Sequence, residues 1–478
     1  MRRPALVALA ASLLLACSVA SAADTVIPAA AVKTAEQLRD KALHDDTAWN
    51  VVASLTTEVG PRLAGSPNDR RARDWAAAKF KALGFDKVYT EPATFPLWVR
   101  RHESGAIVAP FPQPLVLSAL GYSPGTPKGG LIAQVAAFDT LAALKAADPA
   151  TVKGKIVYVG YRMHRSRGGH DYGMGSAVRM AGPVIAAAKG AAGYLLRSAG
   201  TDAHQRIAHA GVTGFRPGDQ GIPAAALSNP DADQLERVLA YGRPVTVKLD
   251  LDCGIVGTYT GANVIGEITG RKYPDQVVAI GGHLDSWDPG TGAIDDGAGI
   301  AISMAAAKLI HDLPQRPDRT IRVIAFANEE MGLWGARAYA DRHAKDVAKF
   351  MLGTDSDLGA GRIYRMGASV KPGARHAIEQ IADVLKPLGV AYDATRPGGG
   401  GSDLGSMHAK GMAALTLNQD ATHYFDWHHT ANDTLDKIDP KELAQNVAVY
   451  AAWSYMAAEA DGDFGSAPGA FADDGTGE

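Results

Sequence analysis

The sequence contains the run Gln276-Val277-Val278-Ala279-Ile280-Gly281-Gly282-His283-Leu284-Asp285, in which a short apolar stretch ends in polar side chains. Runs of this kind recur along the chain, and helical stretches separate them, so strand and helix alternate. This alternation predicts an α/β fold with a mixed, mostly parallel sheet that is covered by helices on both faces. The predicted strands cover residues 263–268, 276–280, 321–327, 349–353 and 412–417, and the predicted helices include residues 299–313 and 333–342.

Histidine and acidic side chains follow these predicted strands. In an open α/β sheet, ligands bind beyond the carboxyl ends of the strands. Buried unpaired charge is costly, whereas a divalent metal satisfies it, and imidazoles with carboxylates suit zinc. Salt bridges at the starts of loops would explain any one strand end, but not all four together. The polar segments are His283-Leu284-Asp285, Glu329-Glu330, Asp355-Ser356-Asp357 and residues 423–429.

A glycine-rich segment, residues 288–299, contains the pair Asp295-Asp296 and opens a predicted helix. Acidic residues are favoured at a helix N-terminus, and glycines allow close approach of the backbone. Taken alone, the pair would be a helix cap. Beside His283 and Glu329-Glu330, it is better explained as part of a metal site.

The sequence upstream of this region predicts a second unit. Residues 34–83 read as helical, a strand is expected near residues 87–91, and the proline-rich residues 109–114 predict a crossing between domains. Residues 113–250 then carry short β-like runs and an Ala-rich helix at residues 183–189, which predicts an inserted, β-rich domain. Its four histidines have no metal-binding spacing. They are His164, His170, His204 and His209.

The two ends of the chain read differently from the rest. Residues 1–22 have the pattern of a signal peptide, with Arg2 and Arg3 before a short apolar run and a small-residue cleavage site. We therefore expect export to the periplasm or the cell exterior, with an outer-membrane lipoprotein anchored at Cys17 as the alternative. No membrane span is expected. The Gly/Asp-rich residues 461–478 predict a disordered tail.

Composition limits the classes of partner. The chain has 478 residues, 46% of them hydrophobic, and a formal net charge of -3. It is therefore globular, and it offers no basic surface that would favour nucleic acid. After cleavage at residue 22 only Cys253 remains, so no internal disulfide is expected, and we interpret this thiol as a buried apolar group.

The motifs together resemble the co-catalytic di-zinc exopeptidases of metallopeptidase family 28, and within it the carboxypeptidase Q branch. The resemblance implies a zinc exopeptidase fold made of residues 23–112 and 251–460, with a protease-associated-like domain at residues 113–250. It also implies two zinc ions and a homodimer. The matching segments are residues 59–62, His283-Leu284-Asp285-Ser286-Trp287-Asp288, residues 292–299, residues 329–335, Asp355-Ser356-Asp357, and residues 424–429 leading to Asp433-Thr434.

The resemblance implies a role for each metal ligand. His283 and Asp357 would hold one zinc ion, and Glu330 and His429 would hold the other. Asp295 would bridge the two ions.

It also implies roles for two further acidic residues. Asp285 would accept the proton on the second ring nitrogen of His283 and fix its tautomer. Glu329 would be the general base that takes a proton from the metal-bridging water and passes it to the leaving amine. The peptide bond between Asp295 and Asp296 would be cis.

Other assignments are less direct. Asp355 competes with Asp357, which matches the Ser-Asp step of the family, and His428 competes with His429, which has the family's spacing to Asp433. Oxyanion stabilisation would fall to His428 or Tyr424. The loop of residues 398–403, with Ser402 and Asp403, either lines the substrate cleft or is a flexible linker.

The predicted function is a secreted di-zinc exopeptidase acting on short peptides, including dipeptides. The sequence does not select the terminus, because Asp288 could bind a free amine and Arg396 a free carboxylate. A non-catalytic receptor or scaffold on the same fold is one alternative, and a single-zinc glutaminyl cyclase is another. The filled ligand set argues against both.

Overall fold

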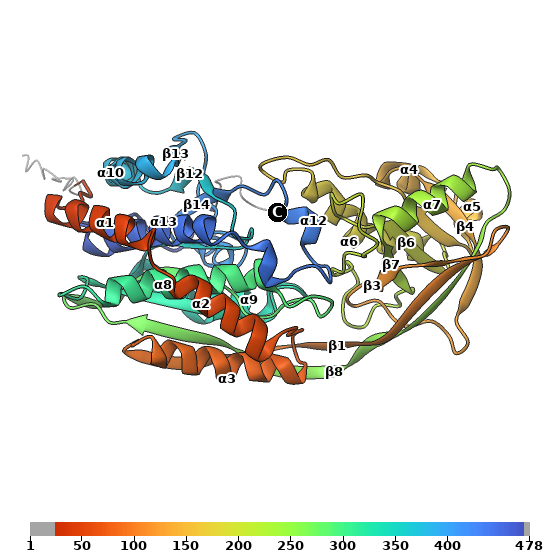
Figure 1. Cartoon of the computed structure of the whole chain (residues 1–478), viewed down its shortest axis with the longest axis horizontal. Coiled ribbons are helices and arrows are strands. Elements are labelled where there is room, and N and C mark those ends of the chain that lie inside the picture. The colour runs from red at the N-terminus through yellow and green to blue at the C-terminus, as the bar shows by residue number, and fades with distance from the viewer. Residues whose placement is uncertain (1–23, 473–478) are drawn as a thin grey trace, which may run out of the picture.

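The computed structural model describes residues 24–472, and it has two lobes joined by two long strands (Figure 1). The predicted signal peptide and Cys17 lie outside these residues. The main lobe contains the sheet whose strands end in polar residues. The second, which we call the insert lobe, comprises residues 113–250 with the adjoining ends of β1 and β8. None of the helices in residues 24–472 is long and apolar enough to cross a membrane.

The sheet of the main lobe is mixed and mostly parallel, as predicted. β9 pairs in parallel with β10 and β11, β11 with β14, and β12 with β13, whereas β8 is antiparallel to β10 and β12 is antiparallel to β14. The carboxyl ends of the parallel strands therefore lie at one edge. The strands are β9 (Tyr273–His283), β10 (Arg319–Phe326), β11 (Phe350–Asp355), β12 (Ile363–Ser369), β13 (Ala391–Tyr392) and β14 (Ala414–Gln419).

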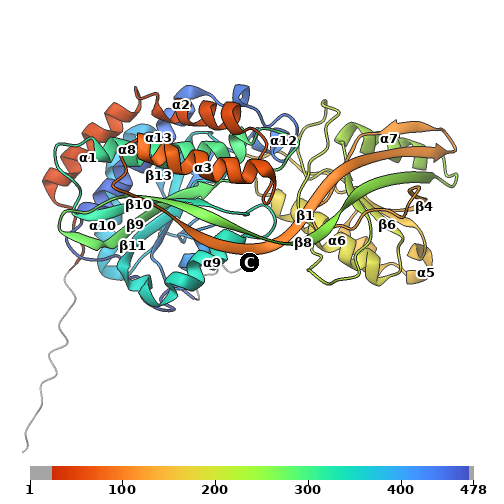
Figure 2. The same ribbon diagram turned by 90° about the horizontal axis from the view of Figure 1, so that it is seen from below.

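Helices cover both faces of this sheet because alternate strand residues point to opposite sides. Val278 and Ile280 pack in the cluster of α8 and α13, whereas Val277 and Ala279 pack with Tyr339 of α9. Figure 2 shows α8, α13 and α2 on one side of the sheet and α9 on the other. The helices of this lobe are α1 (Ala29–Ala42), α2 (Thr47–Ser54), α3 (Pro67–Ala82), α8 (Ala298–His311), α9 (Trp334–His343), α10 (Arg375–Leu385), α11 (Gly405–His408), α12 (Tyr424–Trp427) and α13 (Pro440–Glu459).

A two-stranded ribbon connects the lobes. β1 (Lys87–Ala109) pairs antiparallel with β8 (Thr246–Ile268) along its length, and both run into the insert lobe (Figures 1 and 2). Trp98 and Cys253 already pack in the core of that lobe. The strand expected at residues 87–91 is therefore longer, and the crossing lies within β1, before the predicted residues 109–114.

The insert lobe adds its own parallel strands to the far end of this ribbon. β4 pairs with β8, and β5, β6 and β7 follow in order. α6 begins at Tyr172, well before the predicted residue 183, and its Gly182 packs closely against Tyr194. The elements are β2 (Gln113–Leu115), β3 (Leu117–Ala119), β4 (Leu131–Phe138), α4 (Leu141–Ala146), α5 (Pro149–Val152), β5 (Ile156–Val159), α6 (Tyr172–Ala188), β6 (Gly193–Arg197), β7 (Ala224–Leu227) and α7 (Asn229–Leu239).

The C-terminal segment is not a free tail as far as residue 472. Asp461 forms a β-bridge with Val26, and Phe464 is fully buried. Phe471 stacks on His408 with ring centroids 5.4 Å apart. The prediction of a disordered tail at residues 461–478 is therefore wrong for residues 461–472, because aromatic burial outweighs the local Gly/Asp composition. The remaining residues lie outside the described part.

Candidate metal centre

The polar edge of the main sheet is buried and crowded. His283 is the last residue of β9, Glu330 follows β10, and Asp357 follows β11. His429 comes from the loop after α12. The side chains of His283, Glu330 and His429 are all buried. The four strand ends that the sequence singled out therefore meet at one place.

Two groups of side chains face each other across Asp295. Asp295 Oδ1 lies 3.0 Å from His283 Nε2, which is also 3.5 Å from Asp357 Oδ1. Asp295 Oδ2 lies 3.2 Å from His429 Nε2, which is also 2.9 Å from Glu330 Oε2. One carboxylate thus turns each of its oxygens toward a different histidine and acid pair.

These residues fit metal binding. Three sets of ligand atoms lie within 4.8 Å of one another: Asp295 with His428 and His429, His283 with Asp296 and Asp357, and His283 with Asp295 and Glu330. Asp295 Oδ2 and Glu330 Oε1 are buried and have no hydrogen-bond partner in residues 24–472. Imidazole and carboxylate ligands of this kind are those of zinc sites.

The electrostatics show strong coupling within the cluster. Burial alone lowers the pKa of His283, but Asp357 and Asp295 outweigh it and raise that pKa well above its usual range. His429 behaves in the same way because Glu330 and Asp295 face it, and its pKa is also raised well above the usual range. Protons and a metal ion therefore compete for these imidazoles.

Backbone carbonyls orient both histidines. His283 Nδ1 donates to the carbonyl oxygen of Asp285 at 3.0 Å, whereas the Asp285 carboxylate is 3.8 Å away and accepts from the Glu329 amide at 3.0 Å. The main-chain carbonyl of Asp285, and not its carboxylate as predicted, therefore orients His283. The carboxylate instead accepts from the amide of Glu329, just after β10. His429 Nδ1 donates to the Ala210 carbonyl of the insert lobe at 3.2 Å.

The loop that carries Asp295 is held from two sides. Arg62 is fully buried and donates to the carbonyl oxygens of Leu284, at 2.5 Å, and Gly292, at 2.8 Å. Asp433 accepts from the amides of residues 293 and 294, both at 2.7 Å. The peptide bond between Asp295 and Asp296 is cis. The sequence singled out the segments of Arg62 and Asp433, but not these contacts.

Asp355 and Asp357, the two candidates for one ligand position, occupy different positions. Asp355 Oδ2 accepts from the amides of Asp403 and Leu404, at 2.6 and 2.7 Å, so it is directed at a loop, whereas Asp357 faces His283. Ser402 donates to Asp357 Oδ2 at 2.6 Å. We call the side chains of His283, Asp295, Glu330, Asp357 and His429 the metal cluster. Asp403 is 1% exposed and does not line the cavity of about 410 Å³ that opens onto this cluster.

His428 and His429, the two candidates for the other ligand position, both lie near Asp295. His428 Nε2 is 3.4 Å from Asp295 Oδ2, but Glu330 contacts only His429. The sequence placed Asp296 in the predicted metal-site pair but gave it no role of its own; its carboxylate accepts from the His283 amide at 3.0 Å and the Gly299 amide at 2.9 Å. It therefore supports the strand end and the start of α8 together.

A cavity of about 410 Å³ opens onto the cluster between the lobes. Glu329, Ser402, Tyr424 and His428 line it from the main lobe, and residues of α6 line it from the insert lobe. Burial raises the pKa of Glu329 well above its usual range, with Asp357 and Glu330 adding to the effect. A carboxyl group with a raised pKa beside an accessible cavity is suited to accept and release a proton.

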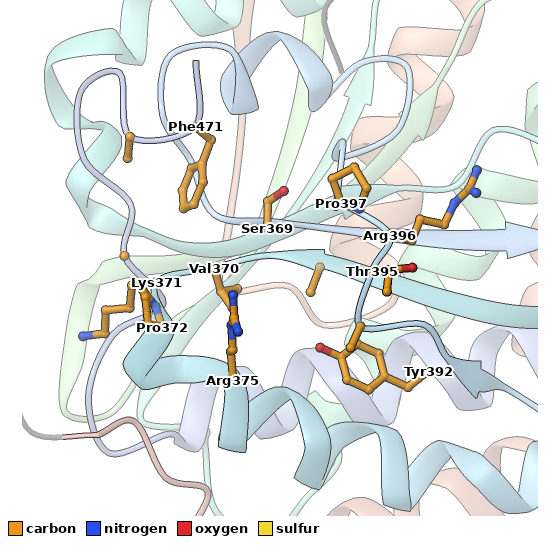
Figure 3. A pocket seen from close by; sticks show the side chains of 14 residues that line it. Ser369, Val370, Lys371, Pro372, Arg375, Tyr392, Thr395, Arg396, Pro397 and Phe471 are labelled. Atoms are coloured by element: carbon orange, nitrogen blue, oxygen red, sulfur yellow. The ribbon is translucent and has the colours of Figure 1, made fainter. Parts of the chain in front are cut away.

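The two side chains considered for substrate termini lie elsewhere. Asp288 forms an ion pair with Arg100. Arg396 lines a different cavity, of about 600 Å³, together with Arg375 and Tyr392 (Figure 3). Neither side chain lines the cavity at the metal cluster, so neither is placed to bind a substrate there.

The chain is similar to known peptidases. A model of the family described as "Peptidase family M28" matches residues 263–454. Carboxypeptidase Q of Bos taurus is 34% identical over 408 residues, which cover 85% of this chain and 84% of the relative. Carboxypeptidase Q of Homo sapiens is 33% identical, with the same coverage.

Solved structures agree with the sequence comparison. A Peptidase M28 precursor from Shewanella amazonensis SB2B has 48% identity and a TM-score of 0.86, covering 90% of this chain and 97% of that one. A zinc aminopeptidase from Bacillus subtilis, at 20% identity, has a TM-score of 0.63 over 88% of this chain and 98% of that one. At this identity the second likeness shows the fold alone.

Proposed function

The chain belongs to peptidase family M28 and is a metallo-exopeptidase, and on that premise we propose that it hydrolyses short peptides with two zinc ions. The observation that carries the proposal is the position of Asp295, whose two oxygens face different histidine and acid pairs. In this proposal His283 and Asp357 would hold one ion, Glu330 and His429 would hold the other, and Asp295 would be shared by both.

The acid and base chemistry falls to Glu329. Zinc held by these residues supplies Lewis-acid polarisation of the scissile carbonyl and lowers the pKa of water. Glu329 lines the cavity and takes a proton from the attacking water, then delivers it to the leaving amine. The hydrogen bond from its amide to Asp285 supports the position of Glu329.

Charge that develops on the carbonyl oxygen requires a donor. His428 and Tyr424 both line the cavity, and His428 Nε2 lies 3.4 Å from Asp295 Oδ2. We assign oxyanion stabilisation to one of these two side chains. Ser402 steadies Asp357 through its hydrogen bond and has no proton-transfer role in this scheme.

The remaining features of the proposal concern export and the insert lobe. We propose that the first 22 residues are removed during export to the periplasm or cell exterior, with lipidation of Cys17 as the alternative. Intact-mass measurement of the processed protein separates the two, because cleavage after Ala22 leaves an unmodified N-terminus. We also propose that residues 113–250 form a protease-associated-like domain that closes one side of the cavity.

A peptide time course tests the activity. Purified residues 23–478, loaded with zinc, are incubated with an unblocked tripeptide of three different residues and with a dipeptide, with and without a chelator. We expect chelator-sensitive release of one terminal residue, which mass spectrometry identifies. Absence of cleavage of both peptides would contradict the proposal and favour a receptor-like protein or a glutaminyl cyclase.

Glu329→Gln tests the base assignment. It keeps the shape of the side chain but cannot accept a proton, so turnover should fall at least about 100-fold while two zinc ions remain bound. Elemental analysis of the purified variant supplies the zinc count. Undiminished turnover would exclude Glu329 as the base.

A further inference from the structure

His209 is the one buried histidine among the four that the sequence places in the insert lobe. It is 1% exposed, whereas the other three are exposed. Neither of its ring nitrogens has a hydrogen-bond partner within residues 24–472. A buried imidazole loses its hydration, so its burial requires a compensating role. His209 lies in residues 198–210, which follow β6 and which we call the contact loop.

The contact loop touches the main lobe at two points of the segment 425–429. The Thr201 amide donates to the Phe425 carbonyl at 2.9 Å, and the Thr201 hydroxyl donates to Asp426 Oδ1 at 2.8 Å. The Ala210 amide donates to the His429 carbonyl at 2.9 Å, and the Ala210 carbonyl accepts from His429 Nδ1 at 3.2 Å. One loop of the insert lobe therefore holds both ends of the segment that carries His429.

Asp202 and His209 connect these two points inside the contact loop. Asp202 directly follows Thr201, and His209 directly precedes Ala210. His209 Nε2 lies 3.9 Å from Asp202 Oδ2, and both side chains are buried. Burial alone would raise the pKa of Asp202, but His209 and the amide of Gln205 outweigh it and lower that pKa. The two side chains therefore attract each other across the loop.

Further contacts restrict His209 to one position. Its amide donates to Ser198 Oγ at 2.9 Å, and its ring lies against Gly200, where an added Cβ would be 2.1 Å from the ring carbon Cε1. Asn229, the first residue of α7, donates its side-chain amide to the carbonyls of Asp202, at 2.8 Å, and Gly200, at 3.3 Å. The position of His209 in turn sets that of the peptide group that follows it.

The two predicted zinc-binding histidines differ in what orients them. A histidine that binds zinc donates its other ring N–H to a carbonyl or carboxylate, which fixes the direction of the ligand nitrogen. For His283 this acceptor is the carbonyl of Asp285, on the same segment. For His429 it is the carbonyl of Ala210, on the other lobe. A displaced contact loop should therefore affect the site of His429 and leave that of His283 intact.

We propose that Asp202 and His209 are positioning residues for the zinc ion held by Glu330 and His429, because together they fix the contact loop and so place the Ala210 carbonyl at His429 Nδ1. Neither side chain lines the cavity at the metal cluster, and both act through His429. This inference rests on the proposed function, because it requires two zinc sites.

Zinc affinity tests the pair without any substrate. His209→Leu keeps a side chain of similar size but offers Asp202 no donor, whereas His209→Gln keeps a donor. Both stepwise affinities of residues 23–478 are measured by competition with a chelator. We expect His209→Leu to weaken one ion about 10-fold or more and to leave the other unchanged, with His209→Gln closer to the parent protein. Unchanged affinities in His209→Leu, or equal weakening of both ions, would overturn the proposal.

Two further variants test how the pair acts. Adding His209→Leu to His429→Ala should not change the affinity for the remaining ion, because the pair acts through His429. Asp202→Asn keeps the shape of its side chain without the charge and should weaken the same ion as His209→Leu, so it tests the pair even if His209→Leu does not fold. A further loss in the double variant would overturn the proposal, as would equal weakening by His209→Leu and His209→Gln, which indicates packing alone.

A control separates this inference from the proposed function. His204→Gln changes an exposed histidine of the contact loop, whose ring forms no hydrogen bond within residues 24–472, and it should match the parent protein in both affinities. Thermal unfolding shows whether each variant is folded. If the parent protein binds fewer than two zinc ions at saturation, the proposed function fails. If it binds two and the folded variants match it, only the positioning role fails.

Discussion

His429 and His428 are adjacent in sequence, but their contacts differ. His429 Nε2 lies near both Asp295 and Glu330, whereas His428 Nε2 lies near Asp295 alone. Their rings stack with centroids 3.5 Å apart. Burial lowers the pKa of His428, and the positive charge of His429 lowers it further, which favours a neutral ring beside the metal cluster.

Separate alanine variants distinguish the two histidines. We expect His429→Ala to bind one zinc ion fewer per chain, because it removes the imidazole shared by Asp295 and Glu330. His428→Ala should keep both ions and lower kcat, by about 100-fold if its ring steadies the oxyanion. Elemental analysis combined with steady-state kinetics provides both readouts. Loss of an ion from His428→Ala but not from His429→Ala would reverse the assignment.

At the scale of elements, the start of α8 packs unusually tightly against the end of β11. A Cβ added at Gly299 would lie 1.9 Å from the carbonyl oxygen of Ser356 and 2.4 Å from Asp296 Oδ1. Ser356 stands between Asp355 and Asp357, so this contact also bears on the metal cluster. A glycine is required here because of the close approach of the backbone, not because of its φ value.

Gly299→Ala should therefore be destabilising. Overpacking in a close-packed interior costs about 1–3 kcal/mol, and we expect the free energy of unfolding in urea to fall by at least that amount. The matched control is Gly173→Ala in the first turn of α6, where no atom lies within 4 Å of the added Cβ. That control should be neutral or slightly stabilising. Equal effects of the two changes would contradict the packing argument.

The C-terminal segment provides a second test at this scale. Phe464 is fully buried, and Lys371 donates its backbone amide to the Phe464 carbonyl at 2.9 Å. We expect Phe464→Ala to lower the free energy of unfolding by about 3–5 kcal/mol. Pro468→Ala changes an exposed residue of the same segment and should have little effect. A negligible loss for Phe464→Ala would mean that the segment does not pack in solution as described.

At the scale of the whole molecule, the lobes meet at the metal cluster itself. The Ala210 amide donates to the His429 carbonyl at 2.9 Å, and the Thr201 amide donates to the Phe425 carbonyl at 2.9 Å. The insert lobe also provides the Ala210 carbonyl that orients His429 and carries Arg179 at the cavity. The insertion is therefore part of the site rather than an appendage to it.

The charge of this buried cluster makes global stability depend on pH and metal together. Burial raises the pKa of Asp355 to about 7, with Asp357 adding to it, and burial and Asp295 raise the pKa of Asp433 to about 7. Between the ordinary value of 3.8 and about 7, the folded state of these groups binds more protons than the unfolded state. Metal-free protein should therefore lose stability as pH rises through this window.

His283 and His429 also make the metal-free protein less stable as pH rises. The raised pKa values of His283 and His429 contribute stability below the unfolded value of 6.5, and that contribution is lost as pH rises through the folded values. Bound zinc replaces these protons, so its stabilising effect should increase from about pH 5 to about pH 8. Calorimetric Tm values of zinc-loaded and chelator-treated protein provide the test. A Tm gap that is constant or narrows with pH would contradict this account.

The residues were sufficient for the α/β class and for placing His283-Leu284-Asp285, Glu329-Glu330, Asp355-Ser356-Asp357 and residues 423–429 at one edge of the sheet, whereas the choice of individual ligands among them came from the family resemblance. Strand periodicity is local, and the carboxyl ends of parallel strands must meet at one edge, so the residues after each strand can be located without coordinates. The order of side chains along the chain therefore indicates where the polar segments meet, but not which side chain of each segment faces Asp295.

Other features depended on tertiary contacts between distant segments. The length of β1 follows from its pairing with β8, and the burial of Phe464 follows from a docking surface far away in sequence. The position of Arg179 is another such feature. Nothing in the sequence of this Ala-rich helix indicates that Arg179 contacts Val212 and Tyr172 and lines the cavity. Periodicity and spacing report local conformation, whereas the burial and pairing of a charge depend on which segments the folded chain brings together.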